Sequence, residues 1–125
     1  MRTMLSMAAL AVLLAAPAVA QEQPTYGMKE PGVKAPVLVR EVKPNYTSDA
    51  MRRQVQGVVE MKAVVKTDGN VDDVRVTRSL DPDLDEEAMK ALRRWEFKPG
   101  TKDGQAVNVE VDIEMTFTLR KKGGL

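Results

Sequence analysis

The most regular alternation of hydrophobic and polar residues lies near the C-terminus of the chain. From Val107 to Leu119, seven hydrophobic positions alternate with Asn, Glu, Asp and Thr. A period of two is typical of a β-strand with one buried face. The pattern therefore predicts a long strand with a hydrophobic core face and an acidic solvent face, which carries Glu110, Asp112 and Glu114.

Two further strands are predicted upstream as a hairpin. Residues 59–66 alternate in the same way, and residues 71–79 continue with valines at spaced positions. Asp68-Gly69 lies between them, and this pair favours a tight hairpin because glycine accepts the positive φ that the turn needs. Residues 37–42 form a short hydrophobic run that predicts a brief strand.

Two segments carry helix signals. Thr47-Ser48-Asp49 supplies candidate caps for a short helix over residues 50–55. The main helix is predicted over residues 81–95, where hydrophobic residues recur at helical spacing. Asp83 and Glu86 have the spacing of a capping box at its start.

These elements follow the order β-α-β-β-α-β and predict an α+β fold. We expect a three-stranded antiparallel or mixed sheet with two helices packed on one face. The last strand is expected to pair with the first long strand. Its outer edge would then be open, and such an edge can accept a foreign strand.

The two ends of the chain are expected to lie outside this body, which covers residues 37–120. Residues 1–20 have a positive start, a hydrophobic run of thirteen residues and small residues before Gln21, as in a cleavable signal peptide. We therefore expect export to the periplasm; the alternative is an uncleaved anchor in the inner membrane. Residues 21–36 are interpreted as an extended or disordered tether containing Pro and Gly, and residues 121–125 as a frayed tail.

Composition argues against catalysis and nucleic-acid binding. The chain has no Cys and no His, which excludes disulfides, thiolate metal sites and Ser-His catalysis. It has 19 basic and 18 acidic residues, and Arg2 is the only charged residue within residues 1–20, so residues 21–125 have no net charge. A neutral chain is a poor candidate for non-specific nucleic-acid binding, which depends on neutralising phosphates. The acidic run from Asp81 resembles a calcium loop, but Glu86 and Leu92 occupy positions that require Gly and Glu. We expect no catalytic residue, metal or cofactor.

Three other groups of residues have alternative interpretations. Trp95 and Phe97 could form an aromatic ligand platform, but a Trp at the end of a hydrophobic helical stripe is expected in the core. Tyr46 could line a partner groove or pack over the first helix. The pairs Arg52-Arg53 and Arg93-Arg94 could meet a partner or acidic lipid, or be solvated helix ends.

A set of short motifs extends through the body. They are Pro44-Asn45-Tyr46, Gly57-Val58-Val59, Thr67-Asp68-Gly69-Asn70-Val71, Leu84-Asp85-Glu86-Glu87-Ala88 and Trp95-Glu96-Phe97-Lys98-Pro99. With this order, and with Trp-x-Phe-x-Pro directly after the main helix, residues 37–120 resemble the C-terminal domain of the TonB family of energy transducers.

The resemblance implies a function in TonB-dependent transport. In that family the domain lies in the periplasm, has no enzymatic activity and binds an extended peptide of an outer-membrane transporter, which adds as a strand to the sheet edge. Carried over to this chain, the binding edge is the last strand, with Tyr46 as a groove residue. The implied site residues are Val107, Val109, Glu110, Val111, Asp112, Ile113, Glu114 and Met115.

Two alternatives remain at this point. A transducer that reaches inner-membrane motor proteins needs a retained anchor and a long spacer, whereas residues 21–36 span at most about 55 Å when fully extended. The chain could also be a self-associating structural or accessory domain, in which two copies pair their open edges as a homodimer and no energy is transduced.

Overall fold

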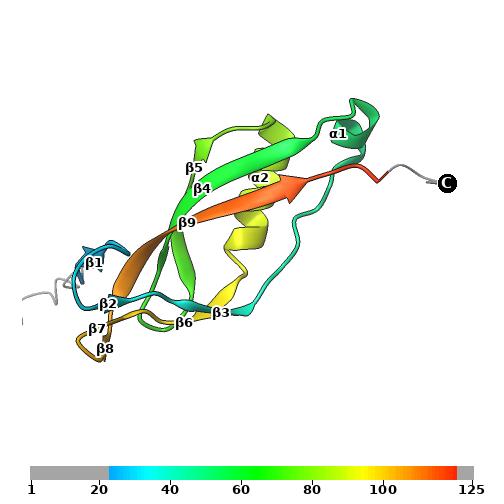
Figure 1. The fold of residues 1–125 in the computed structure, drawn as a ribbon. Helices are drawn as coiled ribbons and strands as arrows, with labels where there is room; N and C mark the ends of the chain where they lie inside the picture. Colours follow the sequence, from blue (N-terminus) through cyan, green and yellow to red (C-terminus); the bar gives the residue numbers. More distant parts are fainter. Residues whose placement is uncertain (1–22, 121–125) are drawn as a thin grey trace, which may run out of the picture.

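The computed structural model describes residues 23–120 of the chain. Within this range it contains two helices and nine strands, several of them only two residues long (Figure 1). The elements are β1 (Thr25–Tyr26), β2 (Val33–Lys34), β3 (Val37–Arg40), α1 (Ser48–Arg52), β4 (Gly57–Val65), β5 (Val71–Arg78), α2 (Pro82–Leu92), β6 (Glu96–Lys98), β7 (Thr101–Lys102), β8 (Gln105–Ala106) and β9 (Asn108–Phe117).

The main sheet has the strand order β1-β9-β4-β5. β4 is central and runs antiparallel to both β5 and β9, and its pairing with β9 extends from Gly57↔Phe117 to Val65↔Val109. The predicted pairing of the last strand with the first long strand is confirmed. The sheet nevertheless has four strands instead of three, because β1 pairs with β9 in parallel. With only two residues, β1 is too short to show any periodicity in the sequence.

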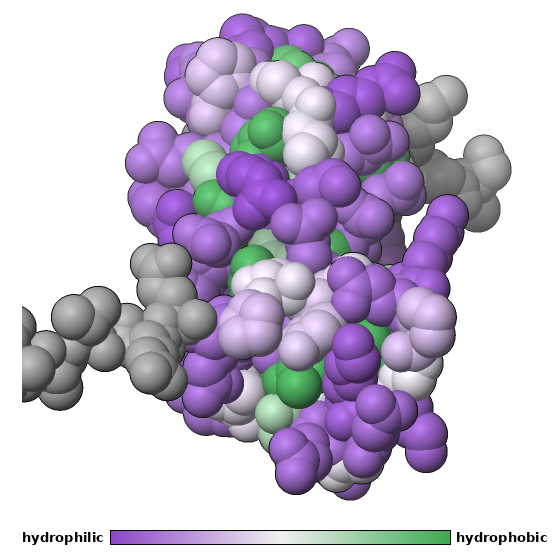
Figure 2. Space-filling view, turned by 90° about the vertical axis from the view of Figure 1, so that its left-hand side faces the viewer, coloured by the Kyte–Doolittle hydropathy of each residue, from purple (hydrophilic) through white to green (hydrophobic). Residues whose placement is uncertain are grey.

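The remaining strands form two small sheets, β2-β7-β8 and β3-β6. β2, like β1, comes from the segment interpreted as a tether. β7 and β8 form a hairpin with its tip at Asp103 and Gly104, which have φ values of 50° and 86°. The end of the molecule that carries β1 and this hairpin is mainly hydrophilic, with small separate hydrophobic areas (Figure 2).

The N-cap residues explain where both helices begin. The Thr47 side chain accepts a hydrogen bond from the Ala50 N–H at 3.2 Å, so Thr47 is the N-cap of α1. α2 has Asp81 as its N-cap instead of the predicted Asp83, and the Asp81 carboxylate accepts from the N–H groups of Asp83 and Leu84. The reason is Pro82, whose fixed φ and missing N–H suit the first helical position.

The hydrophobic core lies between the main sheet and α2, which packs against β4 and β5 (Figure 1). Trp95 is buried and its Nε1 donates to the Val42 carbonyl at 2.8 Å, which confirms its predicted place in the core. The Asp68-Gly69 hairpin is also confirmed. Gly69 has a φ of 86°, and a Cβ at this position would lie 2.0 Å from the Phe97 carbonyl oxygen, so only glycine fits.

The proposed signal peptide over residues 1–20 and the tail over residues 121–125 lie outside the described residues. Neither helix within residues 23–120 has the length and hydrophobicity to cross a bilayer. In the part of the chain that the structure describes, one exposed hydrophobic stretch stands out: Val37, Leu38 and Val39 of β3 are 58%, 41% and 60% exposed.

Candidate functional site

The predicted site residues lie on or next to β9, but their side chains divide between the two faces of the sheet. Val109, Val111 and Met115 are buried in the core, and Ile113 and Val107 are partly buried against it. Their side chains are therefore structural. A partner at the strand edge would therefore meet backbone groups of β9 and not these five side chains.

The acidic residues of β9 project from the opposite face of the sheet. Glu110 accepts from Arg75 at 2.5 Å, and Lys62 lies 3.5 Å from Glu110 and 3.7 Å from Asp112. The hydrogen bond from Arg75 is the main reason why the pKa of Glu110 is lowered from its ordinary value. Glu110 and Asp112 are thus paired across strands. Glu114 lies directly opposite Glu60, another acid, in the β4–β9 register.

The register also determines which backbone groups of β9 face outward. The Lys66 N–H, directly after β4, donates to Asn70 on the β5 side. Because N–H groups alternate sides along a strand, Val65 and every second residue before it face β9. The residues opposite them in β9, which are Val109 and every second residue after it, direct their own N–H and C=O groups toward β4. Leu119 continues this series, and its N–H donates to the Gln56 side chain, just before β4. The N–H and C=O groups of Glu110, Asp112, Glu114 and Thr116 consequently point away from β4.

The beginning of this outer edge is covered by β1. Thr25 pairs with Asn108 and Tyr26 with Val109. Asn108 is only 3% exposed, and its side chain donates to the Gln23 carbonyl at 3.4 Å and accepts from the Thr67 N–H at 3.1 Å. The pairing ends at Tyr26. From Glu110 onward, β9 has no strand on its outer side within residues 23–120.

A groove of about 520 Å³ follows the second half of this edge. One wall is the end of β9 and the residue after it, from Glu114 to Thr118. The other wall is the segment over residues 41–46, which passes outside β9 on its way to α1 (Figure 1). We call this segment the outer wall. Tyr46 and Trp95 both line the groove. The predicted groove position of Tyr46 therefore has a counterpart in the structure.

The outer wall is held at both ends. Near its start, Val42 accepts the hydrogen bond from Trp95 described above. At its end, the Tyr46 hydroxyl donates to the Val55 carbonyl, and the Tyr46 ring packs edge-on against Phe117 at 5.4 Å between centroids. Tyr46 thus packs beside α1 and also lines the groove.

An ion pair between the helices stabilises the same end of the molecule. Arg53, directly after α1, donates to the carboxylate of Asp81 at 2.8 Å and to that of Asp49 at 2.8 Å. The hydrogen bond from Arg53 is the main cause of the lowered pKa of Asp81, and the same bond raises the pKa of Arg53. This contact connects α1 to the start of α2.

Sequence reasoning missed several groove residues. Glu41, Lys43, Pro44, Thr116, Phe117 and Thr118 line the groove although none was among the predicted site residues. The predicted edge strand, from Val107 to Leu119, includes the last three, but the named site residues ended at Met115. The outer-wall residues carry no signal of their own, because only the tertiary structure brings them beside β9. Among residues 23–120, no group of three acidic side chains is arranged to hold a metal ion.

Comparison with known families gives one match that covers more than half of the chain. Residues 42–119 match the family described as the Gram-negative bacterial TonB protein C-terminal. This range includes residues 42–46 of the outer wall, both helices and all of β9.

Individual relatives agree with this match. The chain is 39% identical over 77 residues to protein TonB of Xanthomonas campestris pv. campestris, which covers 61% of this chain and 34% of that protein. It is 33% identical over 76 residues to protein TonB of Escherichia coli, with 60% of this chain and 31% of the relative covered. The chain thus spans about a third of the length of these curated relatives.

A solved structure is also similar. The solution NMR structure of the Pseudomonas aeruginosa TonB CTD superposes with a TM-score of 0.59 and 24% identity, covering 78% of this chain and 96% of that one. This likeness shows the fold and confirms the α+β class predicted from the sequence.

Proposed function

The chain belongs to the family of Gram-negative bacterial TonB C-terminal domains, and on that premise we propose that it is a non-enzymatic, periplasmic peptide-binding module of TonB-dependent transport. Its ligand is an extended peptide segment of an outer-membrane transporter. The peptide adds as a strand to the outer edge of β9 and lies in the groove between Glu114–Thr118 and the outer wall.

The single observation that carries the proposal is the open, outward-facing backbone of β9 beside this groove. Glu114 and Thr116 direct N–H and C=O groups away from β4, and a regular row of such groups is a template for another chain. In strand addition these groups supply affinity, and the alternate side chains of the peptide supply selectivity. At about 3.3 Å per residue, the five residues from Glu114 to Thr118 match a peptide of about five residues.

The molecule itself contains an example of this interaction. β1 pairs with β9 in parallel through two residues, which supports the proposal that the outer edge of β9 can accept a further strand. β1 also sets one limit of the proposed site, since it occupies the edge at Asn108 and Val109 and a longer peptide would collide with it.

The proposal includes the fate of the N-terminal residues. Residues 1–20 direct export and are removed, so that the chain starts at Gln21 in the periplasm and acts without direct connection to inner-membrane motor proteins. A retained segment would instead anchor a short transducer that could reach such motors. The intact mass of the exported protein separates the two, because a mass that includes residues 1–20 contradicts cleavage.

The binding test is an NMR titration of the ¹⁵N-labelled protein with peptides from the N-terminal segments of transporters. We expect the largest shifts at Glu114 to Thr118 and in the outer wall. Thr116→Pro removes an outward donor at an exposed edge position, which sheets tolerate, so binding should fall at least tenfold while the fold survives.

Thr77→Pro is the matched control for this variant. Thr77 is an exposed residue of β5, at the opposite edge of the same sheet, where the pairing with β4 has an irregularity. It should leave peptide binding unchanged. Absence of shifts at millimolar peptide, or equal losses in both variants, would refute the proposal.

A second candidate function, self-association, is favoured by the exposed strand β3. Within residues 23–120 β3 pairs only with β6, and its hydrophobic residues Val37 and Val39 are more than half exposed. An open hydrophobic edge of this kind can pair with a second copy. Sedimentation over a concentration series tests this: a tight dimer in the wild type that Val39→Lys converts to a monomer would support a structural homodimer.

A further inference from the structure

A second hollow lies on the far side of the outer wall, next to the C-terminal half of α2. Its volume is about 440 Å³. Val42 and Ala91 supply hydrophobic surface, and four cationic residues surround it: Lys43 from the outer wall, and Lys90, Arg93 and Arg94 from α2 and the residues directly after it. We call it the basic hollow.

The charges of the basic hollow are only partly compensated. Lys90 forms an ion pair with Glu87 at 3.6 Å, and Glu87 also lines the hollow. Within residues 23–120, the side chains of Lys43, Arg93 and Arg94 have no acidic partner within 4 Å. About three positive charges therefore converge on one hollow, in a chain that is close to neutral overall.

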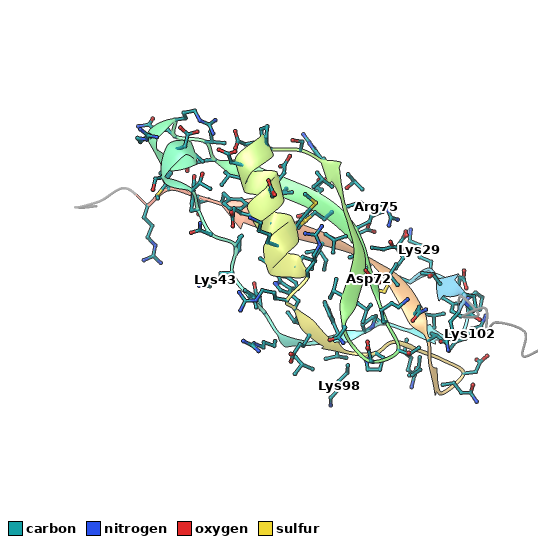
Figure 3. All side chains as sticks on the ribbon, turned by 180° about the vertical axis from the view of Figure 1, so that it is seen from behind. Lys29, Lys43, Asp72, Arg75, Lys98 and Lys102 are labelled. Carbon is teal, nitrogen blue, oxygen red and sulfur yellow. The ribbon has the colours of Figure 1, made fainter. Side chains whose placement is uncertain are left out.

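The helix dipole explains only part of this arrangement. Cations in the last turn of a helix are favourable, which accounts for Arg93 and Arg94. It does not account for Lys43, which comes from a different segment that passes beside the C-terminal end of α2 (Figure 3). All three side chains are exposed, so their mutual repulsion is weak in water, and a bound anion would relieve what remains of it. The geometry fits a carboxylate ligand.

The basic hollow and the groove are separated only by the outer wall. Lys43 lines both cavities, while Pro44 and Tyr46 face the groove and Val42 and Asn45 face the hollow. A chain that leaves the groove across this single extended segment reaches the hollow within a few residues, since each extended residue spans about 3.3 Å.

We propose that the basic hollow is a second subsite for the same partner chain, and that it binds acidic side chains that flank the strand docked on β9. This inference rests on the proposed function. The groove binds the backbone of the partner, whereas Lys43, Arg93 and Arg94 select for carboxylates next to the docked strand.

The test uses tailed versions of one transporter peptide that binds the protein. A triglutamate tail is added at either end in separate peptides, and triglutamine tails of the same length serve as neutral controls. We expect one of the two acidic tails to tighten binding about three- to tenfold over its neutral control, since exposed ion pairs each contribute little. The gain should shrink at high salt.

Variants locate the effect. Arg93→Gln with Arg94→Gln should remove most of the gain and leave the affinity for the neutral-tailed peptide unchanged. Arg52→Gln with Arg78→Gln removes the same charge from exposed positions that do not line the basic hollow and should keep the gain. Lys43→Gln should also lower the gain in affinity from the acidic tail. Because Lys43 lies on a separate segment, this result would show that the loss is not caused by a folding defect near α2.

The outcomes separate the two proposals. If the untailed peptide fails to bind, the proposed function fails and the subsite with it. If it binds and neither acidic tail adds affinity, only the subsite is refuted. The subsite is also refuted if the tail effect persists in the Arg93/Arg94 variant. Binding to vesicles of anionic phospholipid that requires Arg93 and Arg94, without any tail effect, would assign the hollow to a membrane surface instead.

Discussion

The two halves of β9 have the same alternation of residues but opposite surroundings. In the first half, the first two residues, Asn108 and Val109, are covered on their outer side by β1, and Asn108 is buried. The second half, from Glu114 onward, faces a groove and has no strand on that side within residues 23–120. Both halves pair with β4 in one regular register.

This difference shows that residues far away in the sequence determine which part of the β9 edge is open. Asn108 holds Gln23, at the start of the described chain, and also receives the Thr67 N–H from the end of the β4–β5 hairpin. β1 is thereby fixed at one place on the edge, and the rest stays free. The outer wall passes beside the second half of β9 without pairing to it, so the backbone groups there keep an open outer side.

The largest expected effect contrasts the two sides of β9 itself. Val111→Pro removes a backbone donor that faces β4 at a buried position opposite Ala63, so we expect a loss of about 3 kcal/mol in the free energy of unfolding. Thr116→Pro, whose N–H faces outward, should cost less than about 1 kcal/mol. Urea denaturation measures both values. Equal losses would show that the assigned register of inward and outward groups is wrong.

The covered half can be opened at Asn108. Asn108→Ala leaves the Thr67 N–H without its acceptor and releases Gln23, which we expect to cost about 1–3 kcal/mol. Amide hydrogen exchange should become faster at Thr67 and Tyr26, while residues 114–117 keep their rates. Unchanged protection of Tyr26 would mean that Asn108 does not hold β1.

The open half ends near α1, which the Arg53–Asp81 ion pair connects to α2. Because the pKa of Asp81 is lowered in the folded state, its contribution to stability is present above its unfolded value of about 3.8 and is lost as the pH falls through the folded value. Asp81→Asn keeps a cap acceptor but loses the charge. The variant should be less stable than the wild type at pH 6, and the difference should disappear in acid.

Thermal unfolding between pH 2 and pH 7 measures this difference. Asp83→Asn is the control, since the Asp83 carboxylate lies 3.8 Å from Arg53 and is exposed. It should give a nearly parallel pH profile to that of the wild type. An Asp81→Asn profile parallel to the wild type would contradict the role given to the ion pair.

The smallest expected effect concerns the contact between β1 and the β7–β8 hairpin. The Lys102 ammonium lies 4.5 Å from the centre of the Tyr26 ring, a cation–π geometry. Lys102→Gln should cost about 0.5–1 kcal/mol and loosen β1 without affecting the groove. Chemical shifts of the Tyr26 ring are the measure, and Lys98→Gln, on β6, is the control that should leave them unchanged.

Local signals in the sequence identified most of the long elements. The alternation of β9 and β4, the glycine of the hairpin at Gly69 and the cap at Thr47 each act over a few residues, and each prediction is confirmed. The predicted cap at Asp83 is wrong, because Pro82 takes the first helical position and the N-cap is Asp81, two residues earlier. β1, β2 and the hairpin of β7 and β8 were missed, because two-residue strands have no period.

The candidate site was predictable only in part. The sequence named β9 as the edge strand and Tyr46 as a groove residue, and the structure brings Tyr46 to the end of β9. It did not distinguish the inward from the outward backbone groups, because the hydrophobic alternation reports the faces of a sheet and not its edges. It also left open whether Arg93 and Arg94 meet a partner or acidic lipid or are solvated helix ends, because Lys43 joins them only in three dimensions.

The sequence by itself determined where hydrophobic faces form and where helices and turns begin, because these depend on side-chain periodicity and on capping and glycine residues within a few positions. The tertiary structure decided which part of β9 is covered, where the outer wall runs and which charges meet. Those features depend on contacts between residues up to 85 positions apart, such as Gln23 with Asn108, and no local pattern encodes them.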